Sequence, residues 1–445
     1  MRCRTRRLAA SVLAGVIFLV ACSSGGVKQS AATTVSLSTT TAARSTTTTS
    51  PRTTLAASSR LFPLFLGQGV GVVAGTSVAG CPSLYLTTDF VRWRNVPPAI
   101  TPSRSLGPCP YGWDSASFVS PQDGWVLGRD GASTDTVLFH TVDAGRTWTR
   151  EPGGGTLSNG GYEVIGFANA DIGWRQQFAI GASQSYTFEM TTDAGSTWSS
   201  IGSVDDHGGC QFASTVFANR QIGVAAYPLT YDDPFNFAPT PWAWQTTDGG
   251  NTWKRLTVQP PTSLTGSSAF YGLPSFFGSV GVLPVAFVHG SQTVVGFYRS
   301  NDDGVTWSRP VVVPTQSTLF PTGGTDGFCG NTTDVAGDFP VVAIAGPQSW
   351  WVIGTSRTGT RTISVTADGG RSWTMVTPTG LPAYTPTIQE YASQEGFITS
   401  LSASSGTRAW ITVIEGKSLE SQSAQLLQTT DSGRTWSPIK VTTSP

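Results

Sequence analysis

Short apolar runs alternate with turn-forming residues along the chain from Leu61 almost to the C-terminus. Two of the longer runs are Gly124-Trp-Val-Leu-Gly128 and Trp350-Trp-Val-Ile-Gly354. Apolar runs of about four to eight residues, bounded by Gly, Pro, Asn, Asp or Ser, predict β-strands rather than helices. Shorter versions of the same run recur at Val70–Val72, Ile172–Trp174, Ile222–Val224, Val280–Val282 and Ala409–Ile411. The pattern predicts an all-β fold of short strands.

A second pattern is an octapeptide of the form Ser/Thr-x-Asp-x-Gly-x-Ser/Thr-Trp, which follows each apolar run from the second onward. The complete copies contain Asp143, Asp193, Asp248, Asp302, Asp368 and Asp431, and end at Trp148, Trp198, Trp253, Trp307, Trp373 and Trp436. A seventh copy, Thr87–Trp93, contains Asp89, is one residue shorter and lacks the glycine. Successive Asp positions lie 50 to 66 residues apart. That period is typical of one four-stranded blade of a β-propeller.

The octapeptide has the composition of a hairpin turn. Its glycine supplies a positive φ, and its Asp carboxylate accepts N–H groups from the tight loop that follows. The Thr hydroxyl adds a local hydrogen bond, and the Trp begins the next strand with a ring that packs in the core or between blades. Seven equivalent acids around a ring indicate a structural element rather than a catalytic site. We therefore predict a seven-bladed β-propeller with these hairpins between the third and fourth strands of the blades.

The repeat resembles the BNR or Asp-box repeats in the propellers of sialidases, sortilin-type receptors and photosystem II assembly factors. The pairing of a Gly-Trp strand with a hairpin such as Thr246–Trp253 is most similar to the last group. The resemblance covers nearly all of residues 61–445. It implies that the Asp positions support the scaffold at the periphery, away from the face that binds ligands.

The N-terminus has the features of an export signal, because basic residues precede an apolar run from Leu8 to Ala21. The run ends in Leu19-Val-Ala-Cys22, which resembles the lipobox of bacterial lipoproteins. That resemblance implies a lipid on Cys22, and the alternative is an ordinary signal peptide. We predict a signal peptide over residues 1–21, a Ser/Thr-rich flexible linker over 22–60 and the propeller over 61–445. The protein is then extracytoplasmic and held at the cell membrane.

Composition narrows the classes of partner. Charged residues make up 12% of the chain, about half the usual share, and the formal net charge is zero. No cluster of Lys and Arg lies beyond the signal peptide, so we predict no nucleic-acid binding. No Cys-x-x-Cys motif or Cys/His pair at ligand spacing is present, so we predict neither a metal nor another cofactor. The expected ligand is an unidentified protein or glycan.

Four cysteines remain after Cys3 leaves with the signal peptide and Cys22 takes the lipid: Cys81, Cys109, Cys210 and Cys329. An even number in an oxidising compartment predicts two disulfides, for which three connectivities are possible. The last three cysteines each precede the first strand of a blade, and Cys81 lies in a connection between second and third strands. Our hypothesis pairs Cys81 with Cys109 and Cys210 with Cys329.

A ligand is expected on the face that bears the connections between second and third strands and between blades. The longest of these in the first five blades contains Tyr231, Asp232, Asp233 and Trp242. The segment that enters the same blade contains Asp205, Asp206 and His207. Aromatic and acidic residues on Pro-rich loops are typical of recognition surfaces. The alternative is that the aromatic rings only fold the loop back onto its blade.

The enzyme hypothesis is a divergent, sialidase-like glycoside hydrolase. Sialidases carry a Phe/Tyr-Arg-x-Pro motif early in the propeller, whereas this chain has Arg60-Leu-Phe-Pro63. Glu390 beside Tyr391 is the only suggestive acid–tyrosine pair. No Gly-x-Ser-x-Gly, His-Glu-x-x-His or P-loop motif is present, and His140 is expected at a partly buried strand position. We therefore predict a non-catalytic binding or assembly scaffold, with the hydrolase and a passive surface-coat module as alternatives.

Overall fold

A computed structural model gives the fold of most of the chain between Leu61 and Ile439. It describes residues 61–67, 69–76, 82–96, 111–130, 135–155, 162–179, 185–202, 214–226, 243–289, 292–321, 335–337, 340–356, 358–384, 396, 398–415 and 423–439. The predicted signal peptide and linker lie outside these residues. No helix among the described residues is long and apolar enough to cross a membrane.

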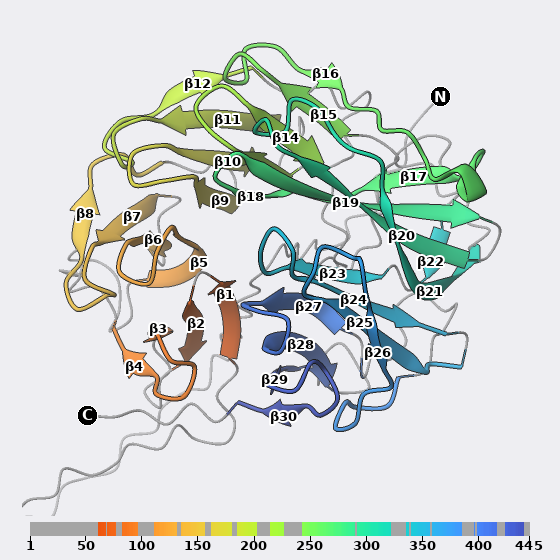
Figure 1. The fold of residues 1–445 in the computed structure, drawn as a ribbon. Helices are drawn as coiled ribbons and strands as arrows, with labels where there is room; N and C mark the ends of the chain where they lie inside the picture. The colour runs from red at the N-terminus through yellow and green to blue at the C-terminus, as the bar shows by residue number, and fades with distance from the viewer. Residues whose placement is uncertain are drawn as a thin grey trace, which may run out of the picture.

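The described strands form seven antiparallel sheets, and each sheet is one blade built from consecutive strands. Six blades have four strands and the fifth has six. The sheets stand side by side around a centre, with β1, β5 and β9 near the middle and β4, β8 and β12 outside (Figure 1). The prediction of an all-β, seven-bladed propeller is confirmed.

The first four blades follow the expected plan of four strands each. Blade one is β1 (Leu61–Gly67), β2 (Val70–Thr76), β3 (Pro82–Thr87) and β4 (Arg94–Asn95), and blade two is β5 (Tyr111–Phe118), β6 (Gly124–Asp130), β7 (Thr136–Thr141) and β8 (Thr149–Glu151). Blade three is β9 (Tyr162–Phe167), β10 (Gly173–Ala179), β11 (Ser185–Thr191) and β12 (Ser199–Ile201), and blade four is β13 (Ser214–Phe217), β14 (Gly223–Ala226), β15 (Ala243–Thr246) and β16 (Lys254–Arg255).

Blade five departs from that plan. After a short 3-10 helix, η1 (Thr262–Leu264), it contains β17 (Ser268–Tyr271), β18 (Ser275–Phe277), β19 (Val280–His289), β20 (Gln292–Ser300), β21 (Val311–Pro321) and β22 (Val335–Gly337). Both β17 and β18 pair with β19, so the first strand is split, and the long β21 pairs with β20 and then with β22. Blade six is β23 (Val341–Ile344), β24 (Trp350–Thr355), β25 (Arg361–Thr366) and β26 (Thr374–Val376), and blade seven is β27 (Ile398–Ala403), β28 (Ala409–Glu415), β29 (Ser423–Thr429) and β30 (Ser437–Pro438).

Burial follows the position of a strand within its blade. Every residue of the second strands β14 and β24 is buried, whereas both residues of the outermost strand β16 are exposed. A second strand is covered on both faces because a neighbouring blade packs against each side, and this accounts for its uninterrupted apolar sequence. Aromatic rings join adjacent blades: Trp125 of β6 stacks on Phe167 of β9, with ring centroids 3.7 Å apart.

The ring closes through side chains where blade seven meets blade one, because every blade is built from consecutive strands of its own. Phe90, which follows β3, stacks on Trp410 of β28 with ring centroids 3.9 Å apart. Val73, Tyr85, Trp93 and Leu426 complete this buried cluster. A stacked aromatic pair adds about 0.5–1.5 kcal/mol to the burial of its rings, so this cluster is an important contribution to closure.

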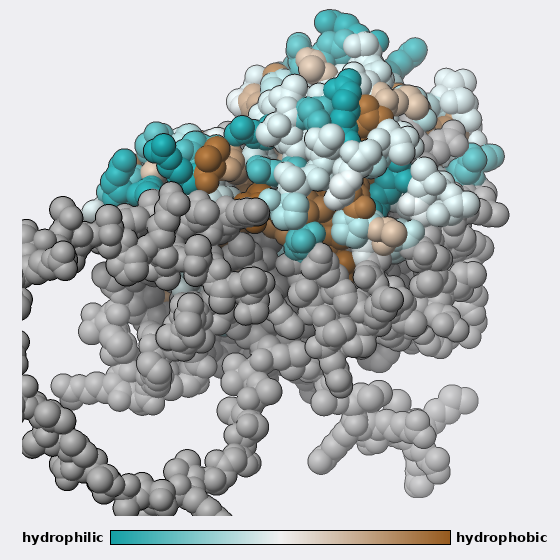
Figure 2. Space-filling model, turned by 90° about the horizontal axis from the view of Figure 1, so that it is seen from below, coloured by the Kyte–Doolittle hydropathy of each residue, from teal (hydrophilic) through white to brown (hydrophobic). Residues whose placement is uncertain are grey.

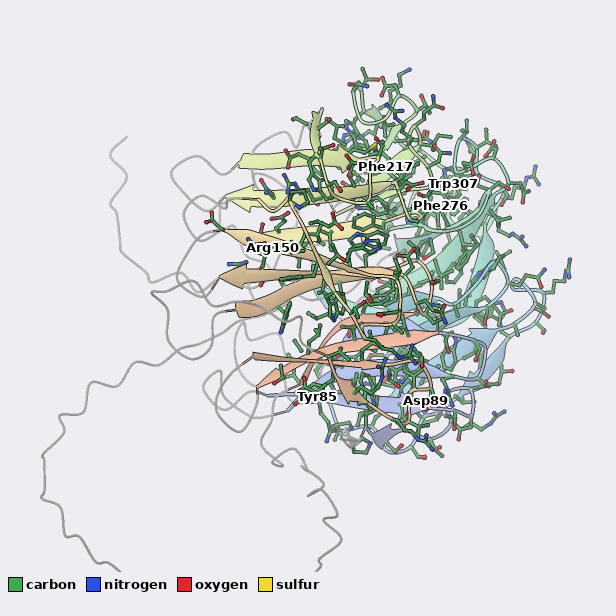
Figure 3. All side chains as sticks on the ribbon, turned by 90° about the vertical axis from the view of Figure 1, so that its left-hand side faces the viewer. Tyr85, Asp89, Arg150, Phe217, Phe276 and Trp307 are labelled. Carbon is green, nitrogen blue, oxygen red and sulfur yellow. The ribbon has the colours of Figure 1, made fainter. Side chains whose placement is uncertain are left out.

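Antiparallel pairing gives the ring two distinct faces. In every blade the hairpin between the first and second strands lies on the same face as the turn between the third and fourth. We call this the Asp-turn face, and the other the opposite face. In Figure 3 Asp89, Phe276 and Trp307 lie toward the Asp-turn face, and Arg150 on β8 lies further toward the opposite face.

Candidate functional site

The repeated Asp residues lie in the turns between third and fourth strands, and blade two shows their geometry. Asp143 Oδ1 accepts the backbone N–H of Thr147 at 2.8 Å, and Oδ2 accepts the Thr147 hydroxyl at 2.7 Å. Thr141 donates its hydroxyl to Asp143 Oδ1 at 2.9 Å and accepts the N–H of Gly145 at 2.8 Å. Ala144 and Gly145 both have positive φ, 61° and 73°, which lets the loop reverse within these few residues. The carboxylate is thus the centre of the turn.

The other five complete turns repeat this arrangement. In each, the carboxylate accepts one backbone N–H at 2.8–3.0 Å and one hydroxyl at 2.6 Å from the residue four positions later. The acids concerned are Asp193, Asp248, Asp302, Asp368 and Asp431. The shorter turn of blade one keeps the backbone bonds, from Val91 and Arg92 to Asp89 Oδ1.

These hydrogen bonds hold the turn carboxylates in their ionised form. The backbone and side-chain bonds from Thr147 lower the pKa of Asp143 to about 2, and the bonds from Ser372 lower the pKa of Asp368 to about 2. At Asp431 desolvation opposes the shift, yet the bonds from Thr435 still bring the pKa to about 2. A general acid must hold a proton near neutral pH. A carboxyl group with so low a pKa, whose oxygens already accept bonds within the turn, is poorly suited to that role.

The tryptophans that end the turns divide into three kinds. Trp148 and Trp253 each donate the indole N–H to a carbonyl of the preceding blade, on Val96 at 2.9 Å and Gly202 at 3.1 Å. Trp198 and Trp436 bond within their own turns, to Gly195 and Gly433. Trp307 and Trp373 are packed against aromatic neighbours, Phe276 and Phe297 respectively. All six are buried or half-buried, as the sequence predicted.

The predicted ligand residues lie outside the described part of the chain. This applies to Asp205, Asp206, His207, Tyr231, Asp232, Asp233 and Trp242, and to the Glu390–Tyr391 pair. It applies equally to Cys22 and to the four cysteines Cys81, Cys109, Cys210 and Cys329. Lipidation, disulfide pairing and the ligand surface remain predictions. Among the described residues, no group of three or more His, Cys, Asp or Glu side chains is arranged to hold a metal ion.

A polar cluster that the sequence did not reveal lies between blades two and three. Glu163 of β9 is only 1% exposed, and its Oε2 accepts the hydroxyl of Thr136 at 2.7 Å and the amide of Gln177 at 3.3 Å. Its Oε1 has no hydrogen bond and lies 3.6 Å from Nη1 of Arg175, an ion-pair distance. Arg175 also pairs with Glu189 through Nε. Two carboxylates thus share one guanidinium in a buried site.

The chain that leaves blade two covers this cluster. The Arg175 guanidinium donates to the Gly153 carbonyl at 2.7 Å and lies 4.7 Å from the ring centroid of Trp198. A Cβ on Gly155 would lie 2.2 Å from Nε2 of Gln177 and 3.2 Å from Glu163 Oε2, so a larger residue there would displace the Gln177 amide. Desolvation raises the pKa of Glu163, against the lowering effect of Thr136 and Arg175. Glu163 thus joins Asp114, whose pKa is also raised by desolvation, as a described carboxyl that is shifted toward its protonated form.

His140 lies on β7 at the Asp-turn end of the same interface and is half-buried, as predicted. Its Nε2 donates to Asp123 Oδ1 at 2.8 Å, and its ring lies flat on Trp125 with centroids 4.3 Å apart. Glu151, whose Oε1 lies 3.7 Å from the other ring nitrogen, accepts the Ser196 hydroxyl of blade three at 3.0 Å. The sequence showed no partner for His140, because Asp123 and Glu151 belong to other strands and turns. The cluster of His140, Asp123 and Glu151 in blade two is thus joined to Ser196 of blade three.

Comparison with known proteins finds only distant similarity. The chain matches no protein-family model. It is 24% identical over 230 residues to a xyloglucanase of a Paenibacillus species, a match that covers 47% of this chain and 21% of that protein. The chain thus spans about a fifth of the length of the curated relative it matches.

Similar solved structures are β-propellers. YCF48 from Cyanidioschyzon merolae is 14% identical, with 86% of this chain and 97% of that chain covered and a TM-score of 0.42. The GH74 xyloglucanase from Xanthomonas campestris is 12% identical, with 85% and 81% covered and a TM-score of 0.29. The Aleuria aurantia lectin is 11% identical, with 72% and 95% covered and a TM-score of 0.34. At these levels the likeness concerns the fold alone.

Proposed function

We propose that this protein is an extracytoplasmic, lipid-anchored scaffold that binds a protein or glycan on its opposite face and has no catalytic activity. The main support is that the repeated Asp residues, the most conspicuous acids of the sequence, are engaged in structural turns. Asp143 and its five full equivalents are bonded within their own turns and stay ionised, so they stabilise the frame. What remains variable between blades is the set of connections on the opposite face. A rigid ring with variable loops is a common plan for binding proteins.

Two finer statements belong to the same proposal. We place the repeats in the Asp-box class, because the octapeptide recurs in six complete copies and each copy builds the same bonded turn. We also propose that Cys22 is lipidated, because an apolar run and Leu-Val-Ala precede it. Mass spectrometry of the mature N-terminus tests the second point. A diacylated Cys22 is expected, and an unmodified N-terminus elsewhere would contradict it.

The binding proposal is tested on the native envelope. We expect the full-length protein to cross-link to one defined partner, and a variant with Asp232→Asn, Asp233→Asn and Trp242→Ala to lose most of that product. Val305→Ala is the matched control, because Val305 is 44% exposed in an Asp turn on the other face. Equal cross-linking by both variants would rule out the proposed surface. Absence of any defined product would favour a passive coat.

A second function, glycoside hydrolysis, is favoured by two observations. The sequence similarity to a xyloglucanase concerns an enzyme whose name states a polysaccharide substrate. Glu163 is a buried carboxyl whose raised pKa suits a general acid. The purified full chain is therefore assayed for release of reducing sugars from xyloglucan and for cleavage of sialyl substrates. The scaffold proposal predicts no turnover with either.

Variants make this assay decisive. If turnover is seen, Glu163→Gln and Glu390→Gln separate the two candidate acids. Asp143→Asn is the matched control, since Asp143 belongs to the frame. Loss of turnover in Glu163→Gln alone would replace the scaffold proposal by a hydrolase with its acid between blades two and three. Loss in Glu390→Gln alone would support the sialidase-like alternative.

A further inference from the structure

One position of the Asp turn differs systematically around the ring. The residue three places after the Asp is arginine in blades one, two, six and seven, and Ser196, Asn251 or Val305 in blades three, four and five. In the sequence these arginines are far apart. In the ring blade seven packs against blade one, so the four blades are consecutive. We call the four residues the arginine arc: Arg92, Arg146, Arg371 and Arg434.

The arginine arc is exposed in all four turns, and three of the four acids in these turns are less exposed. Arg92, Arg146, Arg371 and Arg434 are exposed, as is Asp89, whereas Asp143, Asp368 and Asp431 are half-buried and direct both oxygens at donors of their own turns. Nη1 of Arg146 donates to the Asp143 carbonyl at 3.3 Å, which fixes the guanidinium beside the turn. The formal charges nearly cancel, but in blades two, six and seven the arginine is the more exposed charge of its turn. A surface that approaches these three turns therefore meets cations first.

Two further arginines connect the turns of the arc. Nη1 of Arg408, in the β27–β28 hairpin, lies 3.4 Å from the Asp89 carbonyl across the seam between blades seven and one. Arg94 of β4 donates to the Ala144 carbonyl of blade two at 2.7 Å. These contacts tie neighbouring turns together. The arc is thus a fixed array rather than a set of independent side chains.

Exposed apolar side chains lie among the arginines. Val91 is 65% exposed beside Arg92, Val142 is 66% exposed in the turn of Arg146, and Met375 is 53% exposed on β26 of blade six. Figure 2 shows the rim from the side of blades one and seven, with hydrophilic residues on the described surface and apolar residues among them. Cations mixed with exposed aliphatic side chains are typical of surfaces that rest on a lipid headgroup layer. A soluble polyanion would use the cations alone.

We propose that the arginine arc docks the propeller directly on an anionic phospholipid bilayer. Guanidinium groups bind lipid phosphates through paired N–H donors, and the valines enter the headgroup layer. The inference rests on the proposed lipid anchor, which would keep the ring near the membrane and raise its effective concentration there. Docking on this face turns the opposite face, with its variable loops, away from the membrane. The consequence is an oriented scaffold.

The path of the chain is compatible with this orientation. β1 runs toward the Asp-turn face, so the predicted linker joins the ring on the opposite face. The linker must then pass around the rim to reach the membrane. Residues 22–60 are 39 residues, which span at most about 130 Å when extended. That reach exceeds the thickness of a blade whose longest strand, β21, has 11 residues, or about 36 Å.

Vesicle binding tests the proposal independently of the anchor. The mature chain, residues 22–445 with Cys22→Ser, is mixed with phosphatidylcholine vesicles, with or without phosphatidylglycerol, and separated by flotation. We expect binding only to the anionic vesicles and a steep decrease as salt is raised. Changing Arg92, Arg146, Arg371 and Arg434 to Gln is expected to weaken binding by about a thousandfold. The matched control changes Arg220, Lys254, Arg255 and Arg309, exposed residues of blades four and five, to Gln.

Each outcome bears on the proposal. Binding that survives in the arc variant, or is lost equally in the control, would overturn it. So would binding of the Cys22→Ser chain to soluble heparin without any binding to anionic vesicles. Failure of this assay leaves the cross-linking result intact, because that experiment concerns the opposite face and uses the anchored protein. Absence of any defined cross-linked product from the unmodified protein, together with normal vesicle binding, would reject the scaffold function and keep the docking surface.

Discussion

The Asp turns of blades one and two share the same hydrogen-bonded arrangement, but the turn of blade one is one residue shorter. In blade two the Thr141 hydroxyl accepts the N–H of Gly145, four residues later, and both Ala144 and Gly145 have positive φ. In blade one the Thr87 hydroxyl accepts the N–H of Phe90, three residues later, and Phe90 alone has positive φ, at 56°. The shorter turn has lost one left-handed residue.

The missing residue also changes the bonds of the carboxylate. Asp143 accepts a backbone N–H and a hydroxyl from Thr147. In blade one Trp93 follows Arg92 directly, so no hydroxyl residue stands at the position of Thr147, and Asp89 Oδ1 accepts two backbone N–H groups instead. The core of the motif, a threonine and an aspartate around a reversal, survives the deletion. The glycine does not.

What blade one gains is a side chain at the seam of the ring. A bulky residue rarely adopts positive φ, because its Cβ then crowds the following carbonyl. Phe90 adopts this conformation, and its side chain is only 5% exposed because it stacks on Trp410 of blade seven. The turn that looks degraded in the sequence is thus the one that closes the ring. A departure from a repeat can mark a place where the repeat meets a different neighbour.

The largest expected effect on stability comes from removing the aromatic side chain of Phe90. Phe90→Ala should lower the free energy of unfolding by about 3–5 kcal/mol, because it deletes a buried aromatic side chain and leaves a cavity at the seam. Ala144→Gly is the matched change at the equivalent position of blade two, where φ is 61° and no seam contact is lost. It should be close to neutral, because relief of the positive φ is offset by the loss of a methyl group that is 5% exposed in the core. Urea unfolding of the two variants measures the difference, and similar losses in both would show that the stack has no special role.

Much of this fold could be predicted from the sequence, and the seam shows why the rest could not. The apolar runs and the octapeptides are local, so seven blades and the positions of the turns follow from short stretches of chain. The role of Phe90 depends on Trp410, which is hundreds of residues away and adjacent only after the ring has closed. The extra strands of blade five have no motif of their own, since β21 and β22 pair after the last recognisable element of the blade.

The candidate site was less predictable for a related reason. Glu163 has no neighbour in sequence that suggests a site, and its partners come from two strands of two blades: Thr136 of β7, and Arg175 and Gln177 of β10. The acids that stand out in the sequence, such as Asp143, are the ones that the structure uses in turns. The connections named as ligand-binding differ from blade to blade and follow no pattern from which a conformation could be inferred.

A smaller effect is expected from the glycine that blade one lacks. Gly145 has φ 73°, and a Cβ there would lie 3.1 Å from Trp148 and 3.3 Å from Leu86 of blade one. Gly145→Ala should therefore destabilise by about 1–2 kcal/mol through backbone strain, with a further cost from crowding. Gly266→Ala isolates the strain, because Gly266 has φ 87° and open space where the Cβ would lie. Thermal unfolding that shows equal losses for both variants would mean that the turn tolerates the contact with blade one.

The smallest effect concerns the two carboxylates themselves. The pKa of Asp143 is lowered to about 2 by the N–H and hydroxyl of Thr147, whereas at Asp89 the N–H of Arg92 is the main lowering contact. The pKa of Asp89 is also lowered, but without the hydrogen bond from a hydroxyl at the position of Thr147. A lowered pKa in the folded state contributes stability above the ordinary value, and this contribution is lost as pH falls from about 4 toward about 2. Thr147→Val removes the hydroxyl and should raise the pKa of Asp143 toward its ordinary value. Carboxyl chemical shifts followed through an acid titration measure both groups, and an unchanged Asp143 in the variant would assign the whole shift to the backbone N–H.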